Sequence, residues 1–322
     1  MKKIASIGMV AVDIITNPAP ALPAIGQCKR VDTIKMYVGG NAANSALDLA
    51  KLGVPVRLAC RIGGDSLGRF VHGEFDRYGV NTQSVTIDEE AETATSIVCL
   101  DPAEKNRRCL LSTQSNDFFC ADDISDELLA SSDIIFLTGI CQLKRFDGEQ
   151  LTSFAKKVHD MGKFVAMDVL WDLDGQWLPK FKEALPYVDL FMPSFDEVEQ
   201  MIHKSDPYEM VKVLRSFGPQ NVIIKLGRHG IIAMEGDQEP YRMSAWDVEN
   251  IVDTTGAGDA FCAGILTGLA KGMNLSDAAS LGQAVSAFCI QDYGTYAGVK
   301  SLDQIFYAMN SGNMKPYSAY LD

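Results

Sequence analysis

The segment from Asp253 to Phe261 carries residue types suited to activating a hydroxyl group, because Gly256-Ala257-Gly258 directly precedes Asp259. Glycine lets the backbone approach a ligand closely, and the first amides of a helix point outward without intrahelical acceptors. The helix dipole reinforces these amides, so such a turn binds anions. A carboxylate beside it is placed to take a proton from a hydroxyl that attacks a phosphoryl group. A helix start with a capping aspartate would explain Gly-x-Gly-Asp alone, but it does not explain the whole string.

The elements that must position this segment alternate along the chain. Apolar runs of strand length occur at residues 3–10, 56–62, 133–139, 163–169, 189–192 and 221–225. Segments of helical period lie between them, at residues 41–52, 67–78, 149–161, 196–201 and 208–217. Strands that are apolar on both faces and alternate with helices predict a mostly parallel sheet covered on each side, with ligands at its carboxyl edge. A further apolar run at 246–252 predicts a strand that leads into Asp253.

Three segments break this pattern. Residues 28–37, 93–100 and 107–112 alternate polar and apolar side chains, and the turn-like residues 101–104 join the last two. Alternation of this kind is typical of half-exposed antiparallel strands. These segments are therefore predicted to form a small separate sheet that stands off the main one. Open strand edges and exposed apolar side chains are usually paired or covered, and this sheet has both, with Ile97, Cys99 and Leu110 as its apolar positions.

Composition narrows the function classes. The formal net charge of −13 argues against nucleic-acid binding and against an anionic membrane surface. No apolar stretch approaches the roughly 18 residues of a membrane-spanning helix. The eight cysteines are scattered and only four histidines exist, which favours free thiols in a reducing, cytoplasmic compartment over a zinc site. A signal peptide is one interpretation of the N-terminus, because an apolar run follows Lys2 and Lys3 and Ala19-Pro20-Ala21 resembles a cleavage site. A buried first strand that ends before Asp13 is favoured.

Two signatures more than 200 residues apart indicate a family. One is the Asp253 to Phe261 string, and the other runs from Val38-Gly39-Gly40-Asn41 through Asn44-Ser45-Ala46 to Ile62-Gly63-Gly64-Asp65. In this order they resemble the signatures of ribokinase-like (PfkB) carbohydrate kinases. The resemblance implies one domain over residues 1–322, a three-layer α/β/α sandwich with a mostly parallel central sheet. It also implies a small β-sheet lid, inserted at about 10–37 and 91–114, and an ATP- and Mg²⁺-dependent sugar kinase.

The resemblance further implies roles for individual residues. Asp259 matches the catalytic base, and the amides of Gly256, Ala257 and Gly258 match the anion hole. The residues that match the sugar site are Asp13, Gly39, Gly40 and Asn44. On the nucleotide side the matching residues are Lys225, Gly227, Gly230 and Gln283, with Arg228 as a further phosphate contact. Glu197 matches a residue that organises Mg²⁺ through water, although Ser194 replaces the usual Asn of that motif. Asp253 and Thr255 match positions that hold K⁺ in many relatives.

The sequence leaves the identity of the sugar substrate open. Residues 168–172 lack the Asn and Arg of the Asp-x-Asn-x-Arg element found in relatives that act on fructose or 2-keto-3-deoxygluconate. A neutral pentose or ketohexose such as ribose or fructose is favoured, with a nucleoside or 2-keto-3-deoxygluconate as the alternative. A non-catalytic sugar or nucleotide sensor is the alternative from another class. A nicotinamide-dependent enzyme would need Gly-x-Gly-x-x-Gly after the first strand, and it is absent. Lids of the family often pair between subunits, so we expect a homodimer through the lid.

Overall fold

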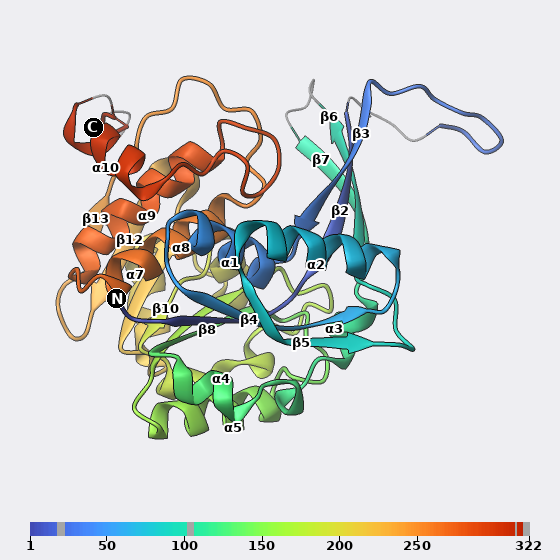
Figure 1. Ribbon diagram of the computed structural model, residues 1–322. Helices are drawn as coiled ribbons and strands as arrows, with labels where there is room; N and C mark the ends of the chain where they lie inside the picture. Colours follow the sequence, from blue (N-terminus) through green and yellow to red (C-terminus); the bar gives the residue numbers. More distant parts are fainter. Residues whose placement is uncertain (18–22, 102–105, 313, 318–322) are drawn as a thin grey trace.

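The computed structural model describes residues 1–17, 23–101, 106–312 and 314–317 (Figure 1). Its main sheet has nine strands in the order β13-β12-β11-β10-β9-β8-β1-β4-β5. The strands from β5 to β11 run parallel, and β12 and β13 are antiparallel at one edge. The bounds are β1 Ile4–Gly8, β4 Val56–Gly63, β5 Asn81–Asp88, β8 Ile134–Ile140, β9 Phe164–Val169, β10 Leu190–Phe191, β11 Asn221–Lys225, β12 Ile231–Glu235 and β13 Tyr241–Met243.

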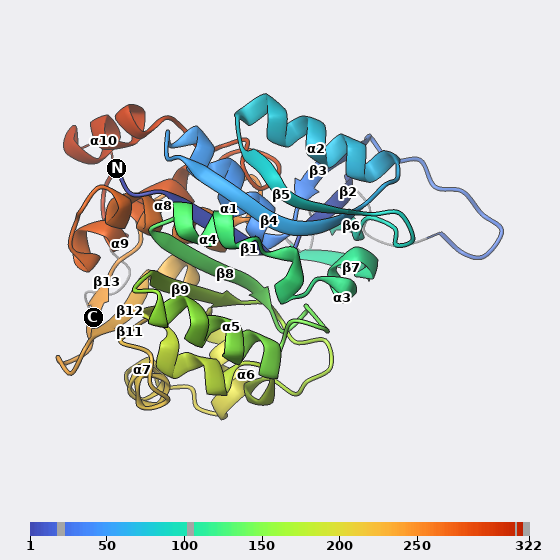
Figure 2. The same ribbon diagram turned by 60° about the horizontal axis from the view of Figure 1, so that its bottom comes forward.

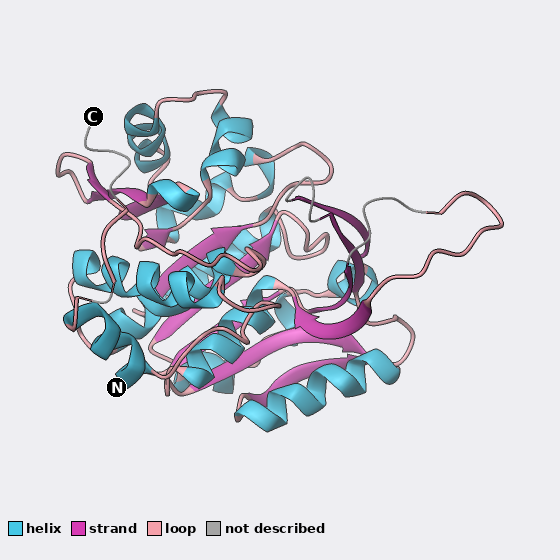
Figure 3. Ribbon diagram, turned by 90° about the horizontal axis from the view of Figure 1, so that it is seen from above, coloured by secondary structure: helices cyan, strands magenta, loops and turns pink. Residues whose placement is uncertain are grey.

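Helices cover both faces of this sheet (Figures 2 and 3). One face carries α1 Asn41–Lys51, α2 Ser66–Tyr78, α8 Ala257–Ala270, α9 Leu275–Cys289 and α10 Leu302–Asn310. The other carries α4 Asp126–Ser131, α5 Glu149–Asp160, α6 Phe195–Ile202 and α7 Pro207–Ser216. Along β8 the side chains alternate between the two cores, since Ile134 and Phe136 pack on the first and Ile135 and Leu137 on the second. This two-sided burial explains why the strands are apolar throughout.

A second sheet of four strands forms the lid, in the order β3-β2-β6-β7. Its bounds are β2 Ala11–Asn17, β3 Thr33–Gly39, β6 Thr95–Asp101 and β7 Asn106–Ser112. Figure 1 shows these strands standing off one end of the main sheet. Asp13 pairs with Ser96, and Ser96 pairs with Leu111, so these three side chains share one face of the lid. Asp13, Ser96 and Leu111 line a pocket over the main sheet.

The predicted three-layer fold is confirmed, and the predicted strands and helices of the main sheet lie within a few residues of the observed bounds. The strand predicted at 246–252 is wrong. This run is a loop with one isolated bridge, Trp246 to Pro316, and its apolar side chains line a pocket instead of joining the sheet. Residues 28–32 are likewise no strand, because β3 begins at Thr33. Most of the turn predicted at 101–104, and Ala19-Pro20-Ala21, lie outside the described residues.

Two smaller expectations concern the cysteines and membranes. All eight cysteines are free thiols, and six of them are buried. In the part of the chain that the structure describes, none of the helices is long and apolar enough to cross a membrane.

Candidate active site

A pocket of about 890 Å³ lies at the carboxyl edge of the main sheet. Chain order reverses at β1, which lies between β4 and β8, and ligands of such sheets bind at this reversal. The pocket takes side chains from the ends of β9, β10 and β11, from the lid, and from the start of α8. Asp168, Ser194, Lys225 and Asp259 are among the residues that line it. Segments far apart in sequence therefore meet at one place.

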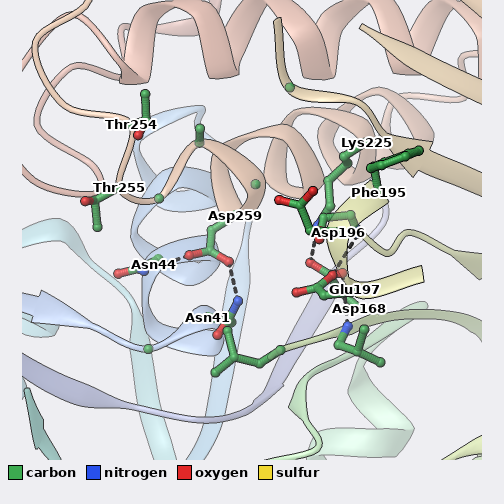
Figure 4. Close-up of a pocket in the computed structure, with 18 of the residues that line it drawn as sticks. Asn41, Asn44, Asp168, Phe195, Asp196, Glu197, Lys225, Thr254, Thr255 and Asp259 are labelled. Atoms are coloured by element: carbon green, nitrogen blue, oxygen red, sulfur yellow. Dashed lines mark hydrogen bonds and ion pairs between the residues drawn. The ribbon is translucent and has the colours of Figure 1, made fainter. Parts of the chain in front are cut away.

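Asp259 lies in the first turn of α8 and is only 7% exposed. Asn41 Nδ2 donates to its Oδ1 at 2.8 Å, and Asn44 Nδ2 donates to its Oδ2 at 2.7 Å (Figure 4). Burial raises the pKa of Asp259 to about 6, although both amide donors and the charge of Lys225 oppose the rise. The carboxylate has no arginine partner among the described residues. It is thus ionised at neutral pH, yet basic enough to accept a proton.

The turn before Asp259 has the geometry that glycine permits. Gly256 caps α8 with φ of 78°, and a Cβ there would lie 2.7 Å from the Cα of Thr295. Gly256, Ala257 and Gly258 all line the pocket. The Ala257 amide is partly engaged, because it donates to the Thr254 carbonyl over 3.3 Å. The start of α8 nevertheless faces the pocket with its positive dipole end.

The residues predicted for the sugar site gather at the lid end of the pocket. Asn44 is 4% exposed and is fixed from two sides, since its Oδ1 accepts a hydrogen bond from Thr295 Oγ1 at 2.8 Å. Ser96 Oγ donates to the Asp13 carboxylate. Gly39 ends β3, and Gly40 caps α1 with φ of 87°, where a Cβ would lie 2.6 Å from the Met9 carbonyl oxygen. Of these four predicted residues, Asp13, Gly40 and Asn44 line the pocket.

A buried charge cluster faces Asp259 across the pocket. Lys225 Nζ forms an ion pair with Asp168 Oδ2 at 2.6 Å. Burial opposes the charge of Lys225, but Asp168 and Glu197 outweigh it and raise the pKa of the lysine. The ammonium lies close to the turn at residues 256–258, because a Cβ on Gly258 would be 3.4 Å from Lys225 Nζ. A permanent positive charge therefore sits beside the start of α8.

Glu197 is held by Ser194 at the start of α6. Ser194 caps α6, and its amide donates to Glu197 Oε2 at 2.7 Å. Burial, with the nearby charge of Asp168, raises the pKa of Glu197. Ser194, which stands where the motif has Asn, therefore orients this carboxylate. Asp196 lines the same pocket, so the three carboxylates of Asp168, Asp196 and Glu197 lie near the start of α8 (Figure 4).

A second pocket of about 540 Å³ adjoins the first. Its walls include the turn that contains Gly227, Arg228 and Gly230, and also Gln283 on α9. Gln283 is 6% exposed, and its side-chain oxygen has no hydrogen-bond partner among the described residues. The two pockets share five lining residues: Lys225, Gly227, Thr254, Ala257 and Gly258. The cavities thus meet at the start of α8.

The segment that contains Asp253 and Thr255 is tied to the loop after α9. Asp253 Oδ1 accepts the Thr255 amide at 2.9 Å, and Oδ2 accepts the Gly294 amide at 3.1 Å. Cys289 Sγ donates to the Thr295 carbonyl at 3.1 Å. Both side-chain oxygens of Asp253 therefore shape the loop.

Several pocket residues were not predicted. Asn41 stands three residues before Asn44 at the start of α1, and this spacing puts both amides on one helix face, a signal that was available in the sequence. Asp168 is the charged residue next to the end of the apolar strand β9, which is a weaker signal. His229 and Arg242 line the pocket from the β11–β13 side of the sheet, and no local pattern marked them.

Comparison with known proteins agrees with this geometry. The model of the pfkB family of carbohydrate kinases matches residues 1–302. An ATP-dependent 6-phosphofructokinase of Thermoanaerobacterium thermosaccharolyticum is 25% identical over 315 residues, covering 93% of this chain and 91% of that protein. A sugar kinase of Archaeoglobus fulgidus is 30% identical over 260 residues, covering 80% and 100% respectively.

Among solved structures, the fold is similar to that of Arabidopsis thaliana ribokinase complexed with ribose and ATP. The TM-score is 0.83 at 22% identity, covering 96% of this chain and 99% of that chain. The expected ribokinase-like fold with a lid is thereby confirmed. Since the family match spans nearly the whole chain, this protein belongs to the PfkB family of ATP-dependent carbohydrate kinases.

Proposed function

We propose that this kinase transfers the γ-phosphoryl group of ATP to a hydroxyl of a small neutral sugar, with Asp259 as the catalytic base. The observation that carries the proposal is the meeting of two pockets at the start of α8, where Asp259, Lys225 and Gly258 lie together. The sugar would occupy the lid-side pocket and the nucleotide the other. The lid and the sheet edge would then work as one domain around the acceptor.

In the proposed reaction the acceptor oxygen attacks the γ-phosphorus, and the bond from that phosphorus to the ADP oxygen breaks. Asp259 takes the proton of the hydroxyl as the new bond forms. Asn41 and Asn44 hold the carboxylate in place. Charge on the transferring group is stabilised by the amides at the α8 start and by the ammonium of Lys225. Water is kept out when the lid covers the sugar.

Mg²⁺ fits the carboxylate-lined side of the pocket. Magnesium prefers oxygen ligands, keeps several waters, and usually takes only one or two protein carboxylates with substrate phosphates. Glu197 and Asp168 are buried carboxylates beside the anion-binding turn, so Glu197 is proposed to hold the ion through water. The metal would neutralise charge on the phosphates. K⁺ is proposed to bind oxygen atoms around Asp253 and Thr255, where the Asp253 carboxylate holds the loop through the Thr255 and Gly294 amides.

The lid-side chemistry supports a neutral substrate. Hydroxyl-binding groups there are Asp13, Asn41, Asn44 and Ser96, and apolar side chains such as Val98 and Leu111 line the same face. The cations that line the described part of this pocket are Lys225, His229 and Arg242, which come from the β11–β13 side of the sheet. Of the two lid arginines, Arg108 pairs with Cys99 on the opposite face, and Arg107 pairs with Leu100 at a register position on the Asp13 face. An acidic or phosphorylated sugar would require a cation at the lid end.

The alternative within the family is a nucleoside or keto-deoxy sugar acid as acceptor. A 5-dehydro-2-deoxygluconokinase of Clostridium botulinum is 26% identical over 319 residues, and this similarity supports the sugar acid as the alternative acceptor. ADP release measured against ribose, fructose, 2-keto-3-deoxygluconate, fructose 6-phosphate and adenosine would decide between them. A preference for the sugar acid or the phosphorylated sugar would contradict the neutral-sugar proposal.

Asp259→Asn tests the base directly. We expect this variant to fold and to bind ATP, but to lose about 10²–10⁴-fold in kcat, because the hydroxyl proton has no acceptor. Nucleotide binding is measured by calorimetry, and turnover by ADP release. A variant that keeps more than about a third of the wild-type kcat would show that another group accepts the proton.

We also propose that two chains pair through their lids. The register places Met36, Ile14, Ile97 and Leu110 in one row across the sheet, on the face opposite Asp13 and Ser96. Met36 is 48% exposed, Ile97 41% and Leu110 60%. A continuous apolar row of this kind on a small open sheet is usually covered. A second copy of the same lid would cover it without blocking the sugar pocket.

A further inference from the structure

One wall of the second pocket comes from outside the region that matches the family. The family match ends at residue 302, where α10 begins. After α10 the chain returns to the pocket, and Tyr317 is one of the residues that line it. This wall is therefore contributed by residues that lie beyond the family match.

Residues 314–317, which we call the strap, are attached to the loop before α8. The Asp247 amide donates to the Lys315 carbonyl at 2.7 Å, and the Tyr317 amide donates to the Ala245 carbonyl at 2.7 Å. Between these bonds, Trp246 and Pro316 form an antiparallel bridge. Met314 packs on the core. The strap is thus held by backbone hydrogen bonds at both ends of a short pairing.

The loop that the strap holds is itself a wall of the pocket. Trp246 lines the pocket with Ile251, and its Nε1 donates to the Ser280 carbonyl over 3.3 Å. Phe261 and Ile290 add apolar surface, and the buried oxygen of Gln283 has no partner among the described residues. Apolar walls with an inward polar atom such as that of Gln283 suit a heterocyclic base, which needs stacking surfaces and one or two hydrogen bonds. The charged and polar lining residues Lys225, Arg228 and Thr254 lie on the side shared with or next to the first pocket.

We propose that the strap completes the binding site for the nucleobase of ATP, and that the ring of Tyr317 packs against the base. This inference rests on the proposed assignment of the second pocket to the nucleotide. The strap contributes to ATP affinity and not to the chemical step, since Asp259 lies in the other pocket. Residues 245–247 lead into Asp253, so the strap also holds the loop that precedes the anion-binding turn.

The test compares Tyr317→Leu and Tyr317→Ala with Tyr317→Phe, and uses Tyr307→Ala on the exposed face of α10 as the control. Loss of the ring is expected to raise KM for ATP about 5–100-fold, since a stacked base contributes on this scale. The kcat at saturating ATP and KM for the sugar are expected to stay within about twofold. Tyr317→Phe and Tyr307→Ala keep wild-type values. Inhibition by inorganic tripolyphosphate, which has no base, is unchanged in all variants.

The outcomes distinguish the proposed role of the strap from the assignment of the second pocket to the nucleotide. Gln283→Ala serves as the second probe, because Gln283 lines the same pocket without contacting the strap by any hydrogen bond of the described residues. If Gln283→Ala weakens ATP and Tyr317→Leu does not, the strap proposal is wrong and the pocket assignment stands. If neither changes KM for ATP, both are wrong. Two results with Tyr317→Leu would also overturn the proposal: weaker inhibition by tripolyphosphate, or an equal rise in KM for ATP and KM for the sugar. Loss of the folded state in both Tyr317→Ala and Tyr317→Leu would overturn it as well.

Discussion

If Asp259 is the catalytic base as proposed, the hydrogen bonds from Asn41 and Asn44 are expected to set the pH at which the kinase becomes active. Burial raises the pKa of Asp259 to about 6, and the two amide donors stabilise its ionised form and oppose that rise. The base must be ionised to accept a proton, so kcat/KM is expected to rise with pH through an acid limb near this value. Removing one donor destabilises the carboxylate and should move the limb to higher pH.

The structure sets the size of this shift. Asn44 Nδ2 lies 2.7 Å from Asp259 Oδ2, the geometry of a hydrogen bond to a charged group. Such bonds contribute about 1.5–3 kcal/mol, and one pKa unit corresponds to about 1.4 kcal/mol. Asn44→Leu should therefore raise the midpoint of the acid limb by about one to two pH units. The hydroxyl of Thr295 keeps a partner in this variant, because it also donates to the Val38 carbonyl over 3.2 Å. The perturbation is therefore confined to Asp259 and the sugar site.

The assay is kcat/KM for the sugar between pH 5 and 9, at saturating Mg·ATP. Asn44→Leu will also raise KM for the sugar, but a weaker contact lowers the whole profile without moving its midpoint. Asn41→Leu should shift the limb in the same direction, and Asn310→Leu, at the exposed end of α10, should not move it. A limb that stays at the wild-type midpoint in folded Asn44→Leu would refute the reasoning, because the titrating group would then not be Asp259.

Two further predictions concern stability and assembly. Asp48 on α1 is fully buried, its carboxyl oxygens have no hydrogen-bond partner among the described residues, and burial with the charge of Asp259 raises its pKa well above the usual value. In the folded protein Asp48 stays protonated at pH values where it ionises in the unfolded chain, so the free energy of unfolding should fall as pH rises above about 4. In Asp48→Asn, the difference between the free energies of unfolding measured in urea at pH 5 and pH 8 should be smaller than in the wild type. An equal difference in the two proteins would refute this prediction. Ile97→Lys should convert the proposed dimer to a monomer in light scattering, because a charge enters the apolar row of the lid; a wild type that is already monomeric at micromolar concentration would contradict the pairing.

Local sequence determined most of the fold. Whether a strand is apolar on both faces, and where a helix has its apolar face, are properties of neighbouring residues, so the sheet and its covering helices were predictable. The turn at Gly256 was predictable for the same reason, since a left-handed conformation and the start of a helix are encoded within a few residues. The run at 246–252 shows the limit of this reasoning. Apolar composition does not distinguish a strand from a loop that lines a pocket, and here the loop is held by the strap.

The sequence by itself thus determined a parallel α/β sheet, a lid, and a carboxylate at the start of a glycine-capped helix. Only the tertiary structure decided how that carboxylate is tuned, because its partner Asn44 lies 215 positions away in the sequence. The ion pair of Lys225 with Asp168, across 57 positions, arises in the same way. Parallel strands bring their carboxyl ends to one edge, but which side chains meet there, and how deeply they are buried, depends on packing across the whole sheet. Burial then sets the pKa values on which the proposed chemistry depends.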